Sequence, residues 1–409
     1  MRDRPLFPAV RGGCLEHMVQ TETTSRSGGW VAVSAVAGAT FTAVTSEMLP
    51  VGLLTPISHG LEVSEGAAGL TLTVTGVVAA VSAPLLVPAL GKFDRRSVLC
   101  ALTAVMAAGN LLAAWSPAFS VMLLARVLVG IGMGGVWAVA ASLAVRLVPP
   151  KSVGSATSLI FSGIAVASVL GVPAGAYLGE LAGWRAAFVA AGGVSLVVLA
   201  ALAMSLPPLP AEGTVRLSAM ARLAVAPRMR TGLIVVALLV IGHFAAYTYV
   251  RPVLEEVAGV GAGLIGTLLL VYGLFGILGN FVAGLGAARS PWRTLLALGA
   301  MLAVTMALVP VLGLTALAAA ALLVVWGLAY GGVSVASQSW MMASAPQAPE
   351  AASALFAGVF NAAIALGALT GGLVADTVGT TAVMWLGGVF AAAAVLVLGA
   401  AGRVSSAPR

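Results

Sequence analysis

Apolar segments long enough to cross a lipid bilayer follow one another from Trp30 to Ala401. A helix needs about 20 mostly apolar residues to cross a hydrocarbon core that is roughly 30 Å thick. Hydrophobic residues make up 60% of the chain and charged residues only 8%, whereas soluble domains carry about 25% charged residues. The sequence therefore predicts an all-α membrane protein with no sizeable domain in water.

The predicted spans form two sets of six, separated by a stretch that begins Pro-Pro-Leu-Pro and carries four arginines. We expect a disordered cytoplasmic tail (1–27), an N-terminal six-helix bundle (28–206), a cytoplasmic linker (207–230), a C-terminal six-helix bundle (231–402) and a C-terminal tail (403–409). The spans are predicted near residues 30–53, 66–90, 98–116, 118–145, 153–179 and 186–206, and again near 231–254, 263–285, 294–314, 316–343, 351–374 and 380–401.

A glycine pattern recurs in the two halves. Gly130–Val136 in the fourth span and Gly327–Val333 in the tenth share the sequence Gly-x-x-x-Gly-Gly-Val, and the same spacing pairs Ser142 with Ser339. Halves with six spans each keep the same membrane orientation, so the repeat is parallel. We therefore predict 12 transmembrane helices in two pseudo-symmetric six-helix bundles around a central cavity.

Basic residues fall on one side of the predicted spans. Of the 20 Lys and Arg residues, all but Arg126, Arg185 and Arg251 lie in the two tails or in the 2–3, 4–5, 6–7 and 8–9 loops. This positive-inside pattern places both termini in the cytoplasm and predicts a multi-pass protein of a bacterial inner membrane. The basic residues that give the net charge of +7 therefore set the orientation of the chain in the membrane. No nucleic-acid partner is expected.

Several other classes of protein do not fit the sequence. Cys14 and Cys100 fall in a tail and a span, and the three histidines are too scattered for a metal site. The glycine-rich runs lack the strand and acidic partner of a dinucleotide site, and no Walker lysine is present. We expect no cofactor, no metal and no catalytic residues. The first 27 residues lack the apolar core of a signal peptide, and Met18 is an alternative start to Met1.

Glu47 lies inside the first predicted span. A carboxyl group in the membrane is energetically costly unless it has a partner, water or a function. Burial favours the protonated form, so proton uptake at one face and release at the other would drive transport. We interpret Glu47 as a proton-coupling residue; the alternative is a permanently neutral side chain hydrogen-bonded to a neighbouring helix.

Arg126 lies within the fourth span, and Trp137 follows eleven positions later on the same helical face. A guanidinium group in a cavity stabilises a nearby carboxylate or binds an anionic group of a solute. We predict that Arg126 and Trp137 both lie at the cavity, where Arg126 would act on a nearby acid or on the solute. The alternative for Arg126 is a side chain that extends to the outer membrane interface.

Polar side chains recur every four residues on the seventh span, at His243, Tyr247 and Arg251. His243 and Tyr247 are predicted to line the substrate cavity, although the tyrosine also fits an aromatic belt at the interface. Amide side chains on later spans are predicted cavity residues too, with hydrogen bonds between helices as the alternative. These amides are Asn280, Gln338 and Asn361.

The loop between the second and third spans reads Gly91-Lys-Phe-Asp94-Arg95-Arg96. Asp94 is placed to cap a helix N-terminus, and the cations are placed to meet carboxylates or helix C-termini. We predict that Gly91, Asp94, Arg95 and Arg96 form a gate that closes the cytoplasmic side. The alternative is an ordinary basic loop that serves only membrane topology.

Several of these segments resemble one known family. Gly91–Arg96 resembles the 2–3 loop signature of the major facilitator superfamily. Thr45–Leu54 resembles the span 1 signature of its 12-span drug–proton antiporter branch, and Val63–Gly66 is similar to the residues after that signature in sugar, nucleoside and drug exporters. Arg126 with the glycines after it resembles that branch's span 4 motif, and Gly171-Val-Pro173-Ala-Gly175 resembles a shortened span 5 antiporter motif.

The resemblance runs from about residue 30 to 400 and implies a secondary transporter that works by alternating access. It implies that Arg126 takes part in proton relay and that Gly171, Pro173 and Gly175 form a hinge. The 8–9 loop departs from the pattern, because Gly286–Arg289 lacks the Asp of its counterpart in the first half. We expect proton-coupled efflux of a small drug, sugar or nucleoside by a monomer whose partners are its solute, protons and the lipid bilayer.

Two other classes of function stay open at this point. The first is an uncoupled facilitator or importer of a small metabolite. The second, less favoured, is a membrane enzyme or receptor, for which the sequence offers neither a paired His/Asp constellation nor a soluble catalytic domain.

Overall fold

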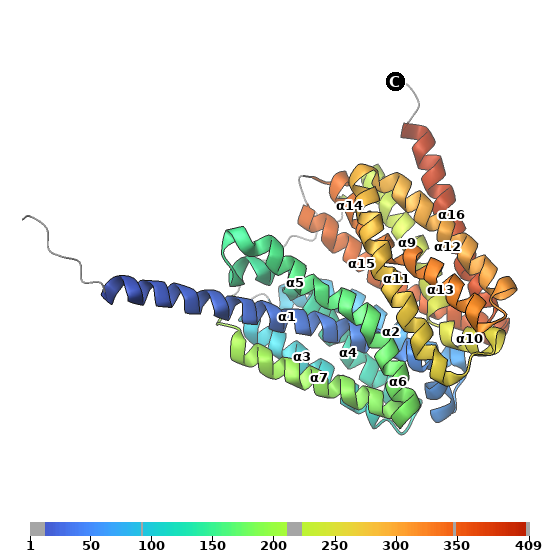
Figure 1. Ribbon diagram of the computed structural model, residues 1–409, viewed down its shortest axis with the longest axis horizontal. Helices are drawn as coiled ribbons and strands as arrows, with labels where there is room; N and C mark the ends of the chain where they lie inside the picture. The colour runs from blue at the N-terminus through green and yellow to red at the C-terminus, as the bar shows by residue number, and fades with distance from the viewer. Residues whose placement is uncertain (1–12, 91–92, 211–222, 347–348, 406–409) are drawn as a thin grey trace, which may run out of the picture.

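The computed structural model describes residues 13–90, 93–210, 223–346 and 349–405, and these residues are helical with no strand among them. Twelve stretches of the described chain are long and apolar enough to span a membrane, the number that the sequence predicts. Figure 1 shows α1–α7, in blue to green, packed together beside α9–α16, in yellow to red.

The helices of the first half cover six spans, the fifth of which is divided among α5, η2 and α6. They are α1 (Gly13–Gly60), α2 (Glu65–Ala89), α3 (Arg95–Ala114), α4 (Phe119–Leu147), the short 3₁₀ turn η1 (Pro150–Ser152), α5 (Val153–Val166), the π-helix η2 (Ala167–Gly171), α6 (Val172–Ala182) and α7 (Trp184–Ser205).

The second half also covers six spans, and breaks divide its first and fourth. Its helices are α9 (Pro227–Tyr247), α10 (Val250–Ala258), α11 (Ala262–Arg289), α12 (Pro291–Leu312), α13 (Ala316–Gly331), α14 (Val333–Ser344), α15 (Pro349–Thr377) and α16 (Ala382–Ser405).

Local sequence explains where several helices begin. Asp94 caps α3 by accepting a hydrogen bond from the Ser97 N–H, and Ser290 caps α12 by accepting one from the Arg293 N–H. Pro227 and Pro291 occupy first helical turns, where a missing N–H leaves no intrahelical bond unmade.

Three element boundaries differ from the expectation. α1 begins at Gly13, inside the segment 1–27 that we expect to be a disordered tail; residues 13–28 contain no proline, so nothing in the backbone stops the helix of the first span there. Similarly, α9 begins at Pro227, inside the predicted linker, and α16 continues to Ser405, beyond the predicted end of the second bundle.

The repeated glycines have a shared structural role. A Cβ atom at Gly130 would lie 2.7 Å from the Thr75 carbonyl oxygen on α2, and one at Gly331 would meet the backbone of Gly276 on α11. Small residues at these points let α4 pack closely on α2 and α13 on α11. The pattern found in the sequence is therefore the contact surface of one helix pair in each half.

The two halves pack against each other symmetrically. α2 lies along α15, and α11 lies along η2 and α6. These pairs join the second span to the eleventh and the eighth to the fifth, as a parallel repeat requires. The structure confirms the predicted pseudo-symmetric bundles, and the midline between them is where α1 and α9 bring the polar groups described next.

Candidate functional site

Arg126 on α4 lies wholly inside the first half, with 0% of its surface exposed. Its Nε donates to the Thr71 carbonyl oxygen at 3.0 Å, and its Nη2 donates to the carbonyl oxygens of Ser46 at 2.8 Å and Glu47 at 3.2 Å. The guanidinium group thus ties α4 to α1 and α2. This position does not fit a side chain that extends to the membrane interface.

Glu47 on α1 is 3% exposed and interacts electrostatically with Arg126. Its buried Oε1 has no hydrogen-bond partner among the described residues. A buried carboxyl group without a hydrogen bond is energetically costly. Glu47 is therefore a buried acidic group of the first half that still offers an oxygen for a hydrogen bond.

A polar contact missed by the sequence analysis fixes this part of α1. Asn110 on α3 is fully buried, and its Nδ2 donates to Ser46 Oγ at 2.7 Å and to Ser195 Oγ on α7 at 3.5 Å. A single amide in the apolar third span is a sequence signal of the same kind as Asn361, and it could have been found in the same way.

The second half holds a cluster of aromatic rings, which we call the aromatic cluster: His243, Tyr247, Tyr272, Trp326 and Tyr330. The His243 ring stacks on Tyr330 with centroids 3.3 Å apart and on Tyr247 at 5.0 Å. Its Nδ1 accepts a hydrogen bond from Trp326 Nε1 at 3.1 Å, and its Nε2 lies 3.5 Å from the Tyr272 hydroxyl. A ring nitrogen that accepts a hydrogen bond belongs to a neutral imidazole.

The aromatic cluster lies inside the bundle. His243 is 1% exposed and Tyr247 5%, so Tyr247 does not belong to a belt at the membrane interface. Sequence analysis missed Trp326 and Tyr330, because aromatic residues are ordinary members of apolar spans and only packing shows that these two rings converge.

Each half contains a buried polar oxygen that lacks a hydrogen-bond partner among the described residues. The Tyr330 hydroxyl interacts electrostatically with Glu47 and, like Glu47 Oε1, has no hydrogen-bond partner in the described part of the chain. Trp137 is partly buried and packs on two hydrophobic clusters, one confined to the first half and one with residues from both halves. The structure thus places Glu47 beside Arg126 inside the first half and gathers the rings of the aromatic cluster inside the second.

The three predicted amides lie apart from this group. Asn280 and Gln338 are exposed, and Asn361 is half-buried with its Nδ2 donating to the Ala357 carbonyl oxygen of its own helix at 2.8 Å. The described residues show no hydrogen bond from these amides to the aromatic cluster or between helices.

The predicted cytoplasmic gate makes its contacts within the first half. Asp94 accepts hydrogen bonds from the Ser97 and Leu209 N–H groups, Arg95 donates to the Leu90 carbonyl oxygen at 3.4 Å, and Arg96 donates to that of Ala203. Gly91 lies outside the described residues. In this conformation the loop attaches the segment after α7 to the start of α3.

The predicted hinge lies where the π-helix η2 meets α6 in the fifth span: Gly171 ends η2, and Pro173 and Gly175 belong to α6. Pro173 lacks the N–H that would continue regular α-helical bonding, and the wide turn of η2 ends two residues before it. A Cβ atom at Gly171 would lie 2.9 Å from Thr45 Oγ1, and one at Gly175 would meet Leu49. This span therefore packs directly on α1, beside Glu47.

Hydrogen bonds join the two halves at one end, which we call the closed end. Arg251 on α10 donates from Nη1 to the Gly52 carbonyl oxygen on α1 at 2.8 Å and from Nε to Glu255 at 2.9 Å. Glu255 also accepts from the Thr55 hydroxyl at 2.8 Å. Arg251 is 4% exposed, so its charge is compensated inside this contact.

A second set of bonds at the closed end involves Asp376 on α15. Its carboxylate accepts from the Ser64 hydroxyl at 2.7 Å and from the Gly66 N–H at 2.9 Å, at the start of α2. The hydroxyl groups of Tyr177 and Thr267 form a further bond across the halves. Among the described residues, the hydrogen bonds between the halves lie at this end.

Comparison with known proteins decides the family. A family model of the Major Facilitator Superfamily matches residues 36–351, which is more than half of the chain. The chain belongs to the major facilitator superfamily. It is therefore a transporter rather than an enzyme, and a multi-pass membrane protein, as the sequence predicts.

Two relatives illustrate the place of the chain within the superfamily. The purine ribonucleoside efflux pump NepI of Escherichia coli strain K12 is 33% identical over 359 residues, which cover 88% of this chain and 91% of the pump. The transcription regulatory protein OpdE of Pseudomonas aeruginosa is 36% identical over 383 residues, which cover 93% of this chain and 94% of that protein.

Solved structures of superfamily-type transporters share the fold. A bacterial homolog of the human lysosomal transporter Spinster, in an inward-facing and occupied conformation, has a TM-score of 0.75 at 17% identity and covers 91% of this chain and 96% of its own. A POT family transporter in complex with 5-aminolevulinic acid has a TM-score of 0.74 at 11% identity, with coverages of 93% and 97%. These likenesses confirm the twelve-helix architecture.

Proposed function

We propose that this chain is a proton-coupled exporter of a small uncharged solute with a planar ring, and that purine nucleosides are its preferred class. The observation that carries the proposal is the buried Glu47 side chain, whose Oε1 has no hydrogen-bond partner among the described residues and which interacts electrostatically with Tyr330 of the aromatic cluster. A titratable group placed beside a ring-binding surface links proton binding to solute binding.

The aromatic cluster supports the choice of solute. Stacked rings bind planar aromatic ligands, with offset or edge contacts that contribute about 0.5–1.5 kcal/mol beyond the buried area. The unpartnered Tyr330 hydroxyl and Glu47 Oε1 would then hydrogen-bond the polar edge of the base. The name of the 33% identical relative, a purine ribonucleoside efflux pump, points to the same class.

The basic loops support an orientation in a bacterial inner membrane with both termini in the cytoplasm. In that orientation the closed end faces the periplasm, and the solute enters from the cytoplasm. A proton leaves Glu47 for the cytoplasm as the solute binds, and the halves then rock. The bonds of Arg251 and Asp376 break, and Asp94, Arg95 and Arg96 help to close the cytoplasmic end.

Everted membrane vesicles test this proposal. In vesicles with an acidic lumen, addition of a purine ribonucleoside should release protons and load the lumen with nucleoside, and Glu47→Gln should abolish both while leaving the amount of protein in the membrane unchanged. An uncoupled facilitator would move nucleoside with no pH response. Gradient-dependent uptake at the wild-type rate by Glu47→Gln would remove Glu47 from the mechanism.

A further inference from the structure

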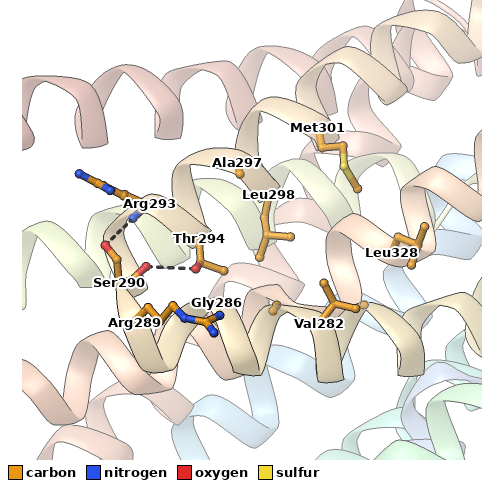
Figure 2. A pocket seen from close by; sticks show the side chains of 12 residues that line it. Val282, Gly286, Arg289, Ser290, Arg293, Thr294, Ala297, Leu298, Met301 and Leu328 are labelled. Atoms are coloured by element: carbon orange, nitrogen blue, oxygen red, sulfur yellow. Dashed lines mark hydrogen bonds between the residues drawn. The ribbon is translucent and has the colours of Figure 1, made fainter.

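A cavity of about 550 Å³ lies between α11, α12 and α13, apart from the Glu47 site. Figure 2 shows how its lining is divided: Arg289, Ser290, Arg293 and Thr294 gather at one end, and Val282, Met301 and Leu328 lie toward the other. The cavity therefore has one polar, basic end and one apolar end.

The turn between α11 and α12 builds the basic end. Ser290 Oγ accepts from the Arg293 N–H at 3.3 Å, and Thr294 Oγ1 donates to the Ser290 carbonyl oxygen at 3.0 Å. These bonds hold the start of α12 beside the end of α11, so that Arg289 and Arg293 both belong to the cavity lining; in Figure 2 the Arg289 side chain lies along α11 and the Arg293 side chain extends outward from the turn. Small residues at Gly286 and Ala297 leave the space between the two helices.

The two arginines are exposed, and neither has an ion-pair partner in the part of the chain that the structure describes. The corresponding turn of the first half differs, because Asp94 supplies a carboxylate beside Arg95 and Arg96. The second half has Ser290 as its helix cap instead. Arg289 and Arg293 are therefore available to bind a negatively charged group of another molecule.

The apolar end of the cavity faces the hydrocarbon of the membrane. Val282, which lines this end of the cavity, is 59% exposed, and its neighbours Phe281 and Leu285 outside the lining are 68% and 69% exposed; exposed apolar side chains of a membrane-spanning helix are placed to contact lipid tails. The basic turn is also on the side that the positive-inside pattern assigns to the cytoplasm. A ligand that matches both ends has a negative head at the cytoplasmic interface and a long apolar tail.

We propose that this cavity binds an anionic phospholipid of the inner leaflet. Its phosphate lies between Arg289 and Arg293, because guanidinium groups bind phosphate oxygens through paired hydrogen bonds. One acyl chain follows Val282, Met301 and Leu328 into the cavity. Basic pockets between spans on the cytoplasmic side suit anionic lipid heads in general. The proposal concerns a site separate from the transport pathway.

Native mass spectrometry of the full chain in detergent tests the lipid site. Phosphatidylglycerol should stay bound at concentrations where phosphatidylcholine does not, and Arg289→Gln with Arg293→Gln should weaken its binding about tenfold or more. Arg230→Gln, which removes an exposed arginine elsewhere on the same side, is the matched control and should bind as the wild type does.

A second pair of variants tests the apolar end of the cavity. Ala297→Phe fills the cavity and should also weaken phosphatidylglycerol binding, whereas Ala300→Phe changes an exposed alanine of the same helix outside the lining and should not. Soluble glycerol phosphate should fail to displace the lipid, because it lacks a tail. Full displacement by glycerol phosphate would make this a free-phosphate site and overturn the proposal.

Equal retention of phosphatidylglycerol and phosphatidylcholine by the wild type would also overturn the lipid-site proposal. Unchanged phosphatidylglycerol binding by the variant with Arg289→Gln and Arg293→Gln would overturn it too. Each variant is first checked for a single gel-filtration peak and a wild-type melting temperature, and the lipid comparison on the wild type stands even if a variant fails to fold. Lipid binding is measured without a gradient or nucleoside, so its failure and the failure of the export proposal are separate results.

Discussion

Single polar residues carry most of the functional information in this chain, because a buried polar group in a membrane protein has lost water as its partner. Arg126 replaces water with three backbone carbonyl groups on α1 and α2. Glu47 has no such replacement among the described residues. The guanidinium group therefore holds α4 against α1 and α2, and Glu47 is the residue that we propose to exchange a proton.

Two tyrosine variants separate binding from stability at this scale. Tyr330→Phe keeps the ring that stacks on His243 and removes a hydroxyl that has no described partner, so it should raise the KM for nucleoside severalfold with little change in melting temperature. Tyr249→Phe removes a hydroxyl that donates to the Ala368 carbonyl oxygen at 3.0 Å, so it should lower stability by about 1 kcal/mol with KM unchanged. Uptake assays and thermal unfolding measure the two effects; equal KM values for both variants would contradict the role of Tyr330.

Whether a residue of the candidate site could be predicted from the sequence depended on the chemistry of its side chain. Glu47, Arg126 and His243 could be found in the sequence because a titratable side chain in an apolar span stands out on energetic grounds. Trp326 and Tyr330 could not, since an aromatic ring in an apolar span has no energetic cost and its function comes from neighbours on other helices.

At the scale of helices, the departures from regular geometry lie next to the site. The seventh span breaks between α9 and α10 just after Tyr247, the tenth breaks after Gly331, next to Tyr330, and η2 widens the fifth beside Thr45. Hydropathy located every span, because membrane thickness fixes the length of a span, but it did not give the ends of the first helix, which runs from Gly13 to Gly60. It contains no information about these interruptions, which depend on backbone bonding and on packing across helices.

The π-helix gives a prediction about rate. Pro173→Ala restores an N–H next to η2 and allows regular α-helical bonding there, so the fifth span should become straighter and stiffer against α1. We expect kcat to fall severalfold with KM nearly unchanged, as measured by initial rates of uptake in everted vesicles. Pro310→Ala, inside α12 and away from the midline, is the control; a similar loss of rate in that variant would show that any proline removal slows transport.

At the scale of the whole molecule, the contact between the halves at the closed end is finely balanced. Arg251, Thr55 and Asp376 form bonds across the halves. In opposition, the carboxyl group of Glu65 on α2 is repelled by Glu255, Glu256 and Asp376 of the other half. Hydrogen bonds set against like charges are what we expect at a contact that opens and closes in the proposed transport cycle.

This balance predicts a shift in conformation when the bonds are removed. Arg251→Gln combined with Asp376→Asn should raise the population in which the closed end is separated, because the bonds to Gly52 and Ser64 are lost or weakened. Spin labels at Glu62 and Val378, in a chain lacking Cys14 and Cys100, would report this as a longer distance in pulsed electron resonance. Thr380→Val breaks a bond to Glu256 within the second half alone, so its distance distribution should match the parent chain. If the double variant also matched the parent, other contacts would hold the halves together, and the bonds of Arg251 and Asp376 would have no part in setting the resting conformation.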